Sequence, residues 1–140
     1  MAAPKEFVQK GYELPSLTIG PIDRLNLIRM ALFLHDANPA HLDRVYAQES
    51  GLKDVIQQGP LNVAYLIQML MEWAGPEARL IDVSMRFRAN AHPGETLESR
   101  GKVLDRYQDG PHDCVQVEVT QSSSSGAVTL MGKALLQWER

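Results

Sequence analysis

The segment from Asp36 to His41, which reads Asp-Ala-Asn-Pro-Ala-His, combines residue types that can move protons. Its acid and its imidazole are five positions apart, on either side of Asn38-Pro39. Proline fixes its own φ and pushes the residue before it out of the helical region, so this dipeptide predicts a turn. An acid and an imidazole that converge across a turn can hold a water molecule, remove a proton from it and return a proton elsewhere. The residue types alone say little, whereas the order Asp-x-Asn-Pro-x-His followed by Asp43 is a much stronger indication.

Two helical patterns flank this turn and would fix its ends. The first begins at Pro21 and is expected to end at the turn. Its apolar residues Leu25, Ile28, Leu32 and Leu34 recur at roughly helical spacing, which predicts a helix. The second pattern, from His41 to Gln48, predicts a short helix that buries Leu42, Val45 and Tyr46.

A longer helix is predicted to begin near Pro60, after a loop bracketed by Gly51 and Gly59. Proline suits the first turn of a helix, where its missing N–H would be unpaired anyway. Apolar side chains cover much of the girth of this helix, which predicts that it is buried rather than half exposed. They are Val63, Leu66, Ile67, Leu70, Met71 and Trp73. Gly75-Pro76 is a stop signal for the helix.

Strand-like patterns account for most of the remaining chain. One short strand is predicted before the helices, at 14–19, and four follow them, at 80–88, 96–106, 114–120 and 127–137. Val115, Val117 and Val119 fall on one face of their strand. Pro93-Gly94 and the segment Ser122–Gly126 supply turn residues between strands. This order predicts an α+β fold, in which a curved antiparallel sheet wraps around one long central helix.

The length and charge of the chain restrict its class. With 140 residues it is expected to form a single domain, 1–140, with a sizeable core. Its net charge of −3, from 14 basic and 17 acidic residues, argues against nucleic acid as a partner. The segment Met1–Lys10 lacks the apolar run of an export signal, and the apolar stretch Leu61–Trp73 is shorter than the roughly 20 residues of a membrane span. No membrane partner is therefore expected.

Cysteine and histidine usage indicates neither an internal disulfide nor a metal. The single cysteine, Cys114, is expected to be a packed, inert thiol, and it fits a reducing cytoplasm. The four histidines are scattered without metal-ligand spacing, so no metal site is predicted. Two of them, His92 and His112, are close to turn signals and are expected to be solvated.

The motif around the turn resembles the hydratase motif of the MaoC-like dehydratases and (R)-specific enoyl-CoA hydratases, a family with the hot-dog fold. That motif is an Asp-x-Asn-Pro-x-His segment followed by an Asp and, later, by a Gly at the start of the long helix. The matching residues here are Asp36, Asn38, Pro39, His41, Asp43 and Gly59. This chain has Leu34-His35 where the family usually has a small residue and Gly, and Gln58 where the family often has His.

The resemblance implies a hydro-lyase that interconverts a 2-enoyl thioester, of CoA or of acyl carrier protein, and a 3-hydroxyacyl thioester. Such a reaction needs a base, an acid and a donor for the negative charge on the thioester oxygen. Asp36 and His41 are the expected acid–base pair, with their individual roles left open, and the free N–H of Gly59 is the expected donor. The predicted substrate-binding residues are Asn38, His35 and Gln58. Since CoA or phosphopantetheine belongs to the substrate, no further cofactor is expected.

Two other functions are compatible with a hot-dog chain. A thioesterase would use a carboxylate on the thioester carbon and would not need the Asn-Pro-His arrangement. A non-catalytic subunit would only build the acyl tunnel of a heteromeric dehydratase, a role that the intact Asp36 and His41 disfavour. The resemblance also implies a homodimer, or a heterodimer with a related hot-dog chain, since two such sheets join edge to edge and exposed edges are normally covered.

Overall fold

A short strand and three short helical segments precede the long helix of this protein. In the computed structural model, which describes residues 8–139, these are β1 (Leu17–Ile19), α1 (Arg24–Leu34), the 3₁₀ turn η2 (Pro39–His41) and α2 (Arg44–Glu49). The long helix and four long strands follow: α3 (Gly59–Ala74), β2 (Ala78–Phe87), β3 (Leu97–Asp109), β4 (His112–Ser123) and β5 (Val128–Glu139). The ends of the predicted domain and most of the segment Met1–Lys10 lie outside the described residues.

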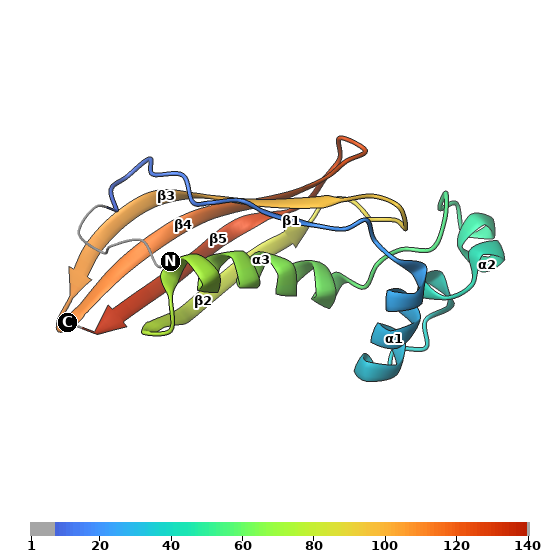
Figure 1. Cartoon of the computed structure of the whole chain (residues 1–140), viewed down its shortest axis with the longest axis horizontal. Helices are drawn as coiled ribbons and strands as arrows, with labels where there is room; N and C mark the ends of the chain where they lie inside the picture. Colours follow the sequence, from blue (N-terminus) through green and yellow to red (C-terminus); the bar gives the residue numbers. More distant parts are fainter. Residues whose placement is uncertain (1–7, 140) are drawn as a thin grey trace.

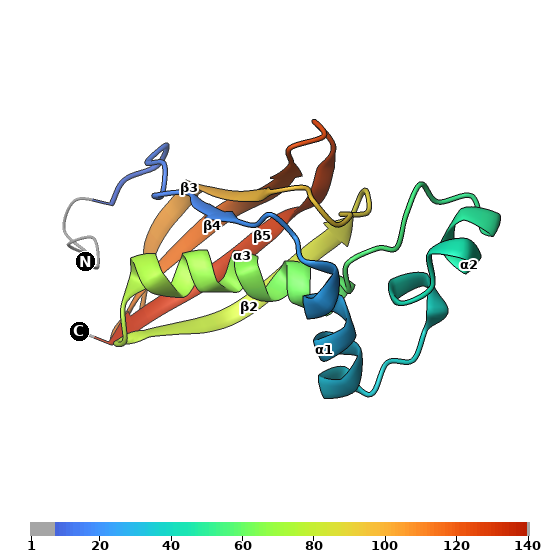
Figure 2. The same ribbon diagram turned by 45° about the vertical axis from the view of Figure 1, so that its right-hand side comes forward.

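The strands form one antiparallel sheet in the order β1-β3-β4-β5-β2. The sheet curves over α3, which runs along its concave side (Figures 1 and 2). Shifts of register between Leu80 and Asp82 and between Val103 and Asp105 mark irregularities in two strands. Irregularities of this kind bend a strand and increase its twist, which helps the sheet to curve. The predicted α+β fold, with a curved sheet around one central helix, is confirmed.

The main core lies between α3 and the sheet. From the helix come Leu66, Met69, Leu70 and Trp73, all buried. The sheet contributes the valine face predicted for β4, which is confirmed: Val115, Val117 and Val119 are buried. Burial of each such side chain stabilises the fold by about 1.5–3 kcal/mol. Cys114 is also buried, as expected. No helix among residues 8–139 is both long and apolar enough to cross a membrane.

The long helix is not buried on every side, contrary to prediction. Val63, Ile67 and Met71 are only half-buried, and Gln68 and Glu72 on the same side are exposed. The physical reason is that the sheet covers one side of α3, and no other described element covers the opposite side (Figure 2). Val63, Ile67 and Met71 therefore form an apolar strip along α3 that no other described element covers.

The larger apolar residues of the two short helices are mostly exposed, and the buried side predicted for the second of them is wrong. In α1 the buried residues are Leu27 and Ala31, whereas Leu32 and Phe33 are 74% and 77% exposed. Leu25 and Ile28 are likewise exposed. In α2, which begins at Arg44 rather than His41, only Ala47 is buried, and Val45 and Tyr46 are exposed. Both helices lie beyond the N-terminal end of α3 and away from the sheet (Figure 1). Only a few residues of each helix are therefore buried against neighbouring segments.

Candidate active site

The turn after α1 is closed by a residue in the left-handed conformation. His35 has φ 51° and ψ 39°, and the N–H of Asp36 donates to the carbonyl of Ala31. A left-handed residue at this place ends a helix by satisfying its last carbonyls, and glycine is the residue that adopts the conformation most readily. This conformation turns the chain so that Asp36 points toward the next segment.

Replacement of His35 by glycine is expected to stabilise the protein. A side chain in the left-handed region costs about 1–2 kcal/mol, and the extra freedom of glycine in the unfolded chain offsets part of the gain. We expect the free energy of unfolding of His35→Gly to rise by about 0.5–1 kcal/mol in urea titration. A lower unfolding free energy would show that the imidazole makes a stabilising contact. An increase in KM of the same variant would support the predicted substrate contact of His35.

Asn38 holds the 3₁₀ turn that follows. Its side-chain oxygen accepts a hydrogen bond from the N–H of Ala40 at 3.0 Å, the geometry of a helix cap. Its own N–H donates to Oδ1 of Asp36 at 3.1 Å. The turn is thus fixed by local hydrogen bonds, and these bonds leave Oδ2 of Asp36 directed to the far side of the turn, where His41 lies.

Asp36 and His41 converge across the turn. Oδ2 of Asp36 is 3.3 Å from Nε2 of His41, whose other nitrogen, Nδ1, lies 2.7 Å from the carbonyl oxygen of Ile56. Because a carbonyl oxygen only accepts, Nδ1 carries a proton, and Nε2 is the nitrogen that can gain or lose one. The His41 side chain is 9% exposed, and that of Asp36 is 38% exposed. The pair therefore joins a buried imidazole to a carboxylate that water can reach.

A cavity of about 280 Å³ lies next to this pair. Its wall includes His41, Gly59, Asn62 and Phe87, together with the neighbouring segments 56–57 and 88–90. Gly59 is the first residue of α3, so its N–H has no acceptor within the helix, and the positive end of the helix dipole is there. A Cβ atom on Gly59 would be 2.9 Å from the ring of Phe87. The site thus combines an acid–imidazole pair with a free N–H at a position where a side chain would displace the ring of Phe87.

The three predicted substrate-binding residues lie outside the wall of this cavity. Asn38 and His35 are exposed on the turn, and Gln58 is fully buried, with its side-chain nitrogen donating to the carbonyl oxygen of Leu27 at 2.8 Å. Gln58 therefore ties the start of α3 to α1. Contact of these three residues with a substrate stays a prediction, as do the catalytic roles of Asp36, His41 and Gly59.

The loop 51–58, here called the strap, carries the carbonyl that orients His41. On its other side, Nδ1 of His92 lies 3.0 Å from the carbonyl oxygen of Val55, the residue before Ile56. Two histidines therefore donate to neighbouring carbonyls of the strap. His92 is buried, which corrects the expectation that it is solvated: turn residues predict a turn, and here the turn packs beneath the strap.

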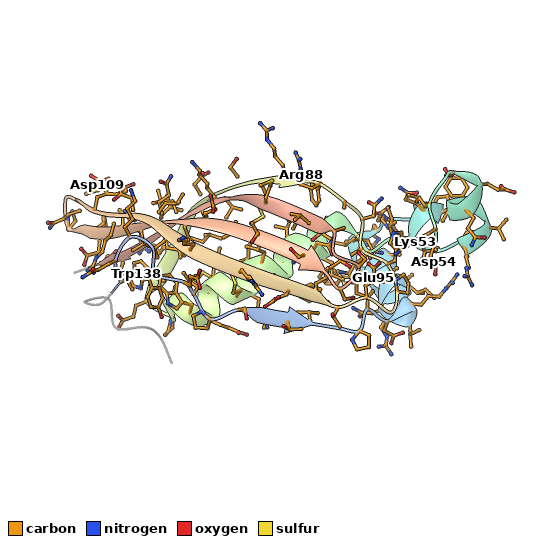
Figure 3. The ribbon with its side chains drawn as sticks, turned by 90° about the horizontal axis from the view of Figure 1, so that it is seen from above. Lys53, Asp54, Arg88, Glu95, Asp109 and Trp138 are labelled. Carbon is orange, nitrogen blue, oxygen red and sulfur yellow. The ribbon has the colours of Figure 1, made fainter. Side chains whose placement is uncertain are left out.

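A buried carboxylate ties the strap to the sheet. Lys53 on the strap lies 2.6 Å from Glu95, which also accepts hydrogen bonds from the N–H of His92 and the hydroxyl of Ser123, each at 2.9 Å. Figure 3 shows Lys53 and Glu95 together at the end of the sheet near α2. Burial alone would raise the pKa of Glu95, but its hydrogen bonds with Lys53, His92 and Ser123 outweigh burial and hold the pKa below its ordinary value.

Neutralisation of Glu95 is expected to destabilise the protein in a pH-dependent way. Because its folded pKa is lowered, the carboxylate stabilises the fold fully above the ordinary pKa of 4.5, and this contribution is lost as the pH falls through the folded value. We expect Glu95→Gln to lower the unfolding free energy by about 1–3 kcal/mol at pH 7, and by less in acid. Urea unfolding at both pH values measures this. The matched variant Glu98→Gln, at an exposed pair with Arg100, should change little, and a pH-independent difference for Glu95→Gln would contradict the charge argument.

Sequence patterns did not predict the role of Glu95 or of Asn62 in this site. Asn62 gave one signal, because it is a polar residue between the apolar residues Leu61 and Val63. Glu95 gave none, since an acid after a Pro-Gly turn is ordinary. Within residues 8–139, no group of three or more His, Cys, Asp or Glu side chains is placed to hold a metal ion.

The model of the MaoC-like domain family matches residues 13–127 of this chain. The chain therefore belongs to the MaoC-like domain family. A search of curated protein sequences finds no match.

Solved structures show the same fold at low sequence identity. The unliganded (R)-hydratase PhaJ1 from Pseudomonas aeruginosa has a TM-score of 0.84 and 22% identity, over 98% of this chain and 86% of that one. The ChsH1-ChsH2 complex from Mycobacterium tuberculosis has a TM-score of 0.79 and 23% identity, over 96% and 99%. The (R)-hydratase from A. caviae involved in PHA biosynthesis has a TM-score of 0.80 and 19% identity, over 94% and 97%. These likenesses confirm the hot-dog fold.

Proposed function

We propose that this protein is a hydro-lyase that reversibly hydrates a 2-enoyl thioester, of CoA or acyl carrier protein, to a 3-hydroxyacyl thioester. The observation that carries the proposal is the pairing of Oδ2 of Asp36 with Nε2 of His41 at 3.3 Å, next to a cavity that also exposes the start of α3 at Gly59. The (R)-hydratase names of two structural neighbours agree with it.

The reaction uses the Gly59 N–H as the donor to the thioester oxygen and the Asp36–His41 pair for both proton transfers. The thioester oxygen accepts a hydrogen bond from the Gly59 N–H, and a water molecule is held by Asp36 and His41. The water oxygen bonds to the β-carbon while one of its protons passes to the Asp36–His41 pair, and the electrons of the double bond move toward the thioester oxygen as an enolate. The enolate then collapses when the α-carbon takes a proton from the pair. The net change is the addition of one water, and the substrate's own CoA or phosphopantetheine is the only carrier involved.

Two assays run in parallel test the proposal against its alternatives. Hydration of crotonyl-CoA is followed by the loss of enoyl absorbance, and hydrolysis of acyl-CoA by the release of free thiol. Hydration without hydrolysis is the expected result. Hydrolysis without hydration would identify a thioesterase, and neither activity, over a panel that includes long-chain and bulky polycyclic enoyl thioesters, would identify a tunnel-building subunit. The same panel also shows which acyl groups the protein accepts.

We further propose that the protein works as a dimer, with a second copy or a related hot-dog chain. The edge strand β2 pairs only with β5 among the described strands, and it exposes Ile81 and Phe87 on a long edge. Such an edge is normally covered. Beside it, the uncovered apolar strip of α3 would also be removed from water. The ChsH1-ChsH2 complex is an assembly of two chains, at least one of which has this fold.

Light scattering measures the mass of the protein in solution and so tests this prediction directly. We expect a dimer at micromolar concentration, and we expect Ile81→Asp, which places a charge on the exposed edge, to shift the protein toward monomer without unfolding it. A monomer alone at that concentration would contradict the homodimer. Co-purification of a second hot-dog chain would then identify the heterodimer.

A further inference from the structure

Asn62 is a carboxamide in the wall of the cavity next to Gly59. It is 3% exposed and occupies the fourth position of α3. Residues three apart on a helix share a face, and helical side chains lean toward the N-terminus. The carboxamide of Asn62 therefore lies over the first turn of α3, on the same cavity as the Gly59 N–H and His41.

The orientation of this carboxamide is fixed by its neighbours. The side-chain nitrogen of Gln57 donates to Oδ1 of Asn62. The backbone carbonyl of Asn62 accepts from Nε2 of Gln121 at 3.0 Å, and Gln121 is itself held by the hydroxyl of Thr129. With Oδ1 occupied by Gln57, the NH₂ is the group that Asn62 can offer to the cavity. A buried amide is costly unless its polar atoms have partners, so a donor directed into a cavity is a position for an acceptor on a bound molecule.

We propose that Nδ2 of Asn62 is a second donor to the thioester oxygen, so that the oxyanion hole of this protein has two members, Gly59 and Asn62. The proposal rests on the hydro-lyase function proposed above. In the enolate the thioester oxygen carries a full negative charge and accepts more than one hydrogen bond. A fixed donor aimed at charge that develops during the reaction raises turnover by about 10²–10³-fold. Gln57 acts as a positioning residue, since it sets the direction of the Asn62 amide and does not touch the oxygen.

The test compares two variants at position 62 in the crotonyl-CoA assay. Asn62→Ala removes the donor, and we expect kcat to fall about 100-fold with KM within a few-fold of wild type, because the bond strengthens mainly in the transition state. Asn62→Asp keeps the oxygen that Gln57 contacts but replaces the NH₂ with an oxygen. We expect the same loss at alkaline pH and a partial recovery in acid, where a protonated carboxyl is again a donor. The matched variant Gln68→Glu, an amide-to-acid change on the exposed side of α3, should keep wild-type kcat.

The outcomes separate this inference from the function on which it rests. If the wild type hydrates crotonyl-CoA and both Asn62 variants stay within about threefold of its kcat, the two-donor hole is wrong and the hydro-lyase stands. If the wild type hydrates no enoyl thioester, both proposals are overturned. Should neither Asn62 variant fold, Gln57→Leu decides: it frees the carboxamide, and we expect kcat to fall about tenfold. An unchanged kcat in folded Gln57→Leu would overturn the inference.

Discussion

Hydration of crotonyl-CoA should fall by about 100-fold or more in Asp36→Asn and in His41→Ala. Asp36→Asn keeps the size of the side chain but removes the charge that lies 3.3 Å from Nε2 of His41. His41→Ala removes the nitrogen that exchanges a proton with water. It also leaves the carbonyl of Ile56 without its partner, which lowers stability by about 1–3 kcal/mol. Circular dichroism at the assay temperature establishes that each variant is folded.

The double variant Asp36→Asn, His41→Ala should be little worse than the worse single variant, because groups that act on one water molecule are not additive. Asp43→Asn is the matched control. Asp43 caps α2 through the N–H groups of Val45 and Tyr46, and asparagine caps a helix about as well, so activity should be retained. Hydration that persists in a folded double variant would refute the assignment, and the chain would then be a binding or tunnel-building subunit.

Gly59→Val should lower turnover by about 100-fold, and Gly59→Ala by less. A Cβ atom at position 59 would meet the ring of Phe87 at 2.9 Å. Because Phe87 is largely exposed, its ring can move, and the direction of that movement decides how much of the cavity remains. A larger side chain also keeps the thioester oxygen away from the helix N–H. Initial rates and KM values for the two variants measure the effect.

The double variant Gly59→Ala, Phe87→Ala separates the two causes. If the displaced ring closes the cavity, removal of the ring restores turnover. If the new methyl group itself blocks the N–H, turnover stays low. Wild-type turnover in a folded Gly59→Val variant would contradict the role of the Gly59 N–H as a donor.

The parts of the site that were predictable from sequence are those fixed by local geometry. Asp36 and His41 converge because a proline, a capping Asn38 and a left-handed residue act within a few positions of chain. Gly59 was predictable because the start of the long helix is marked by proline. Asn62 and Glu95 depend on which distant segments pack together, and no local pattern carries that information.

The same distinction explains the errors in the fold. The helical spacing of Leu25, Ile28 and Leu32 predicted that α1 exists, but the residues that α1 buries are Leu27 and Ala31. An amphipathic pattern shows which side is apolar, and the position of the neighbouring elements decides which residues they cover. For His92, the sequence predicted the turn correctly, but it carried no signal for the strap that covers it.

The hydrogen bonds that attach the strap should make it open and close as one unit. The amide of Ile56 donates to the carbonyl of Ala40, and that of Gln57 to the carbonyl of Ala91, each about as short as a helix hydrogen bond at 3.0 and 2.8 Å. The two histidines bind the carbonyls of Val55 and Ile56, which belong to the same two peptide groups as these amides. We therefore expect the histidine bonds to break in the same event that releases the amides. Local opening of such a segment is a cooperative step. The amides of Ile56 and Gln57 should therefore show the same protection factor in deuterium exchange, and each opening should leave His41 without its fixed orientation until the segment closes again.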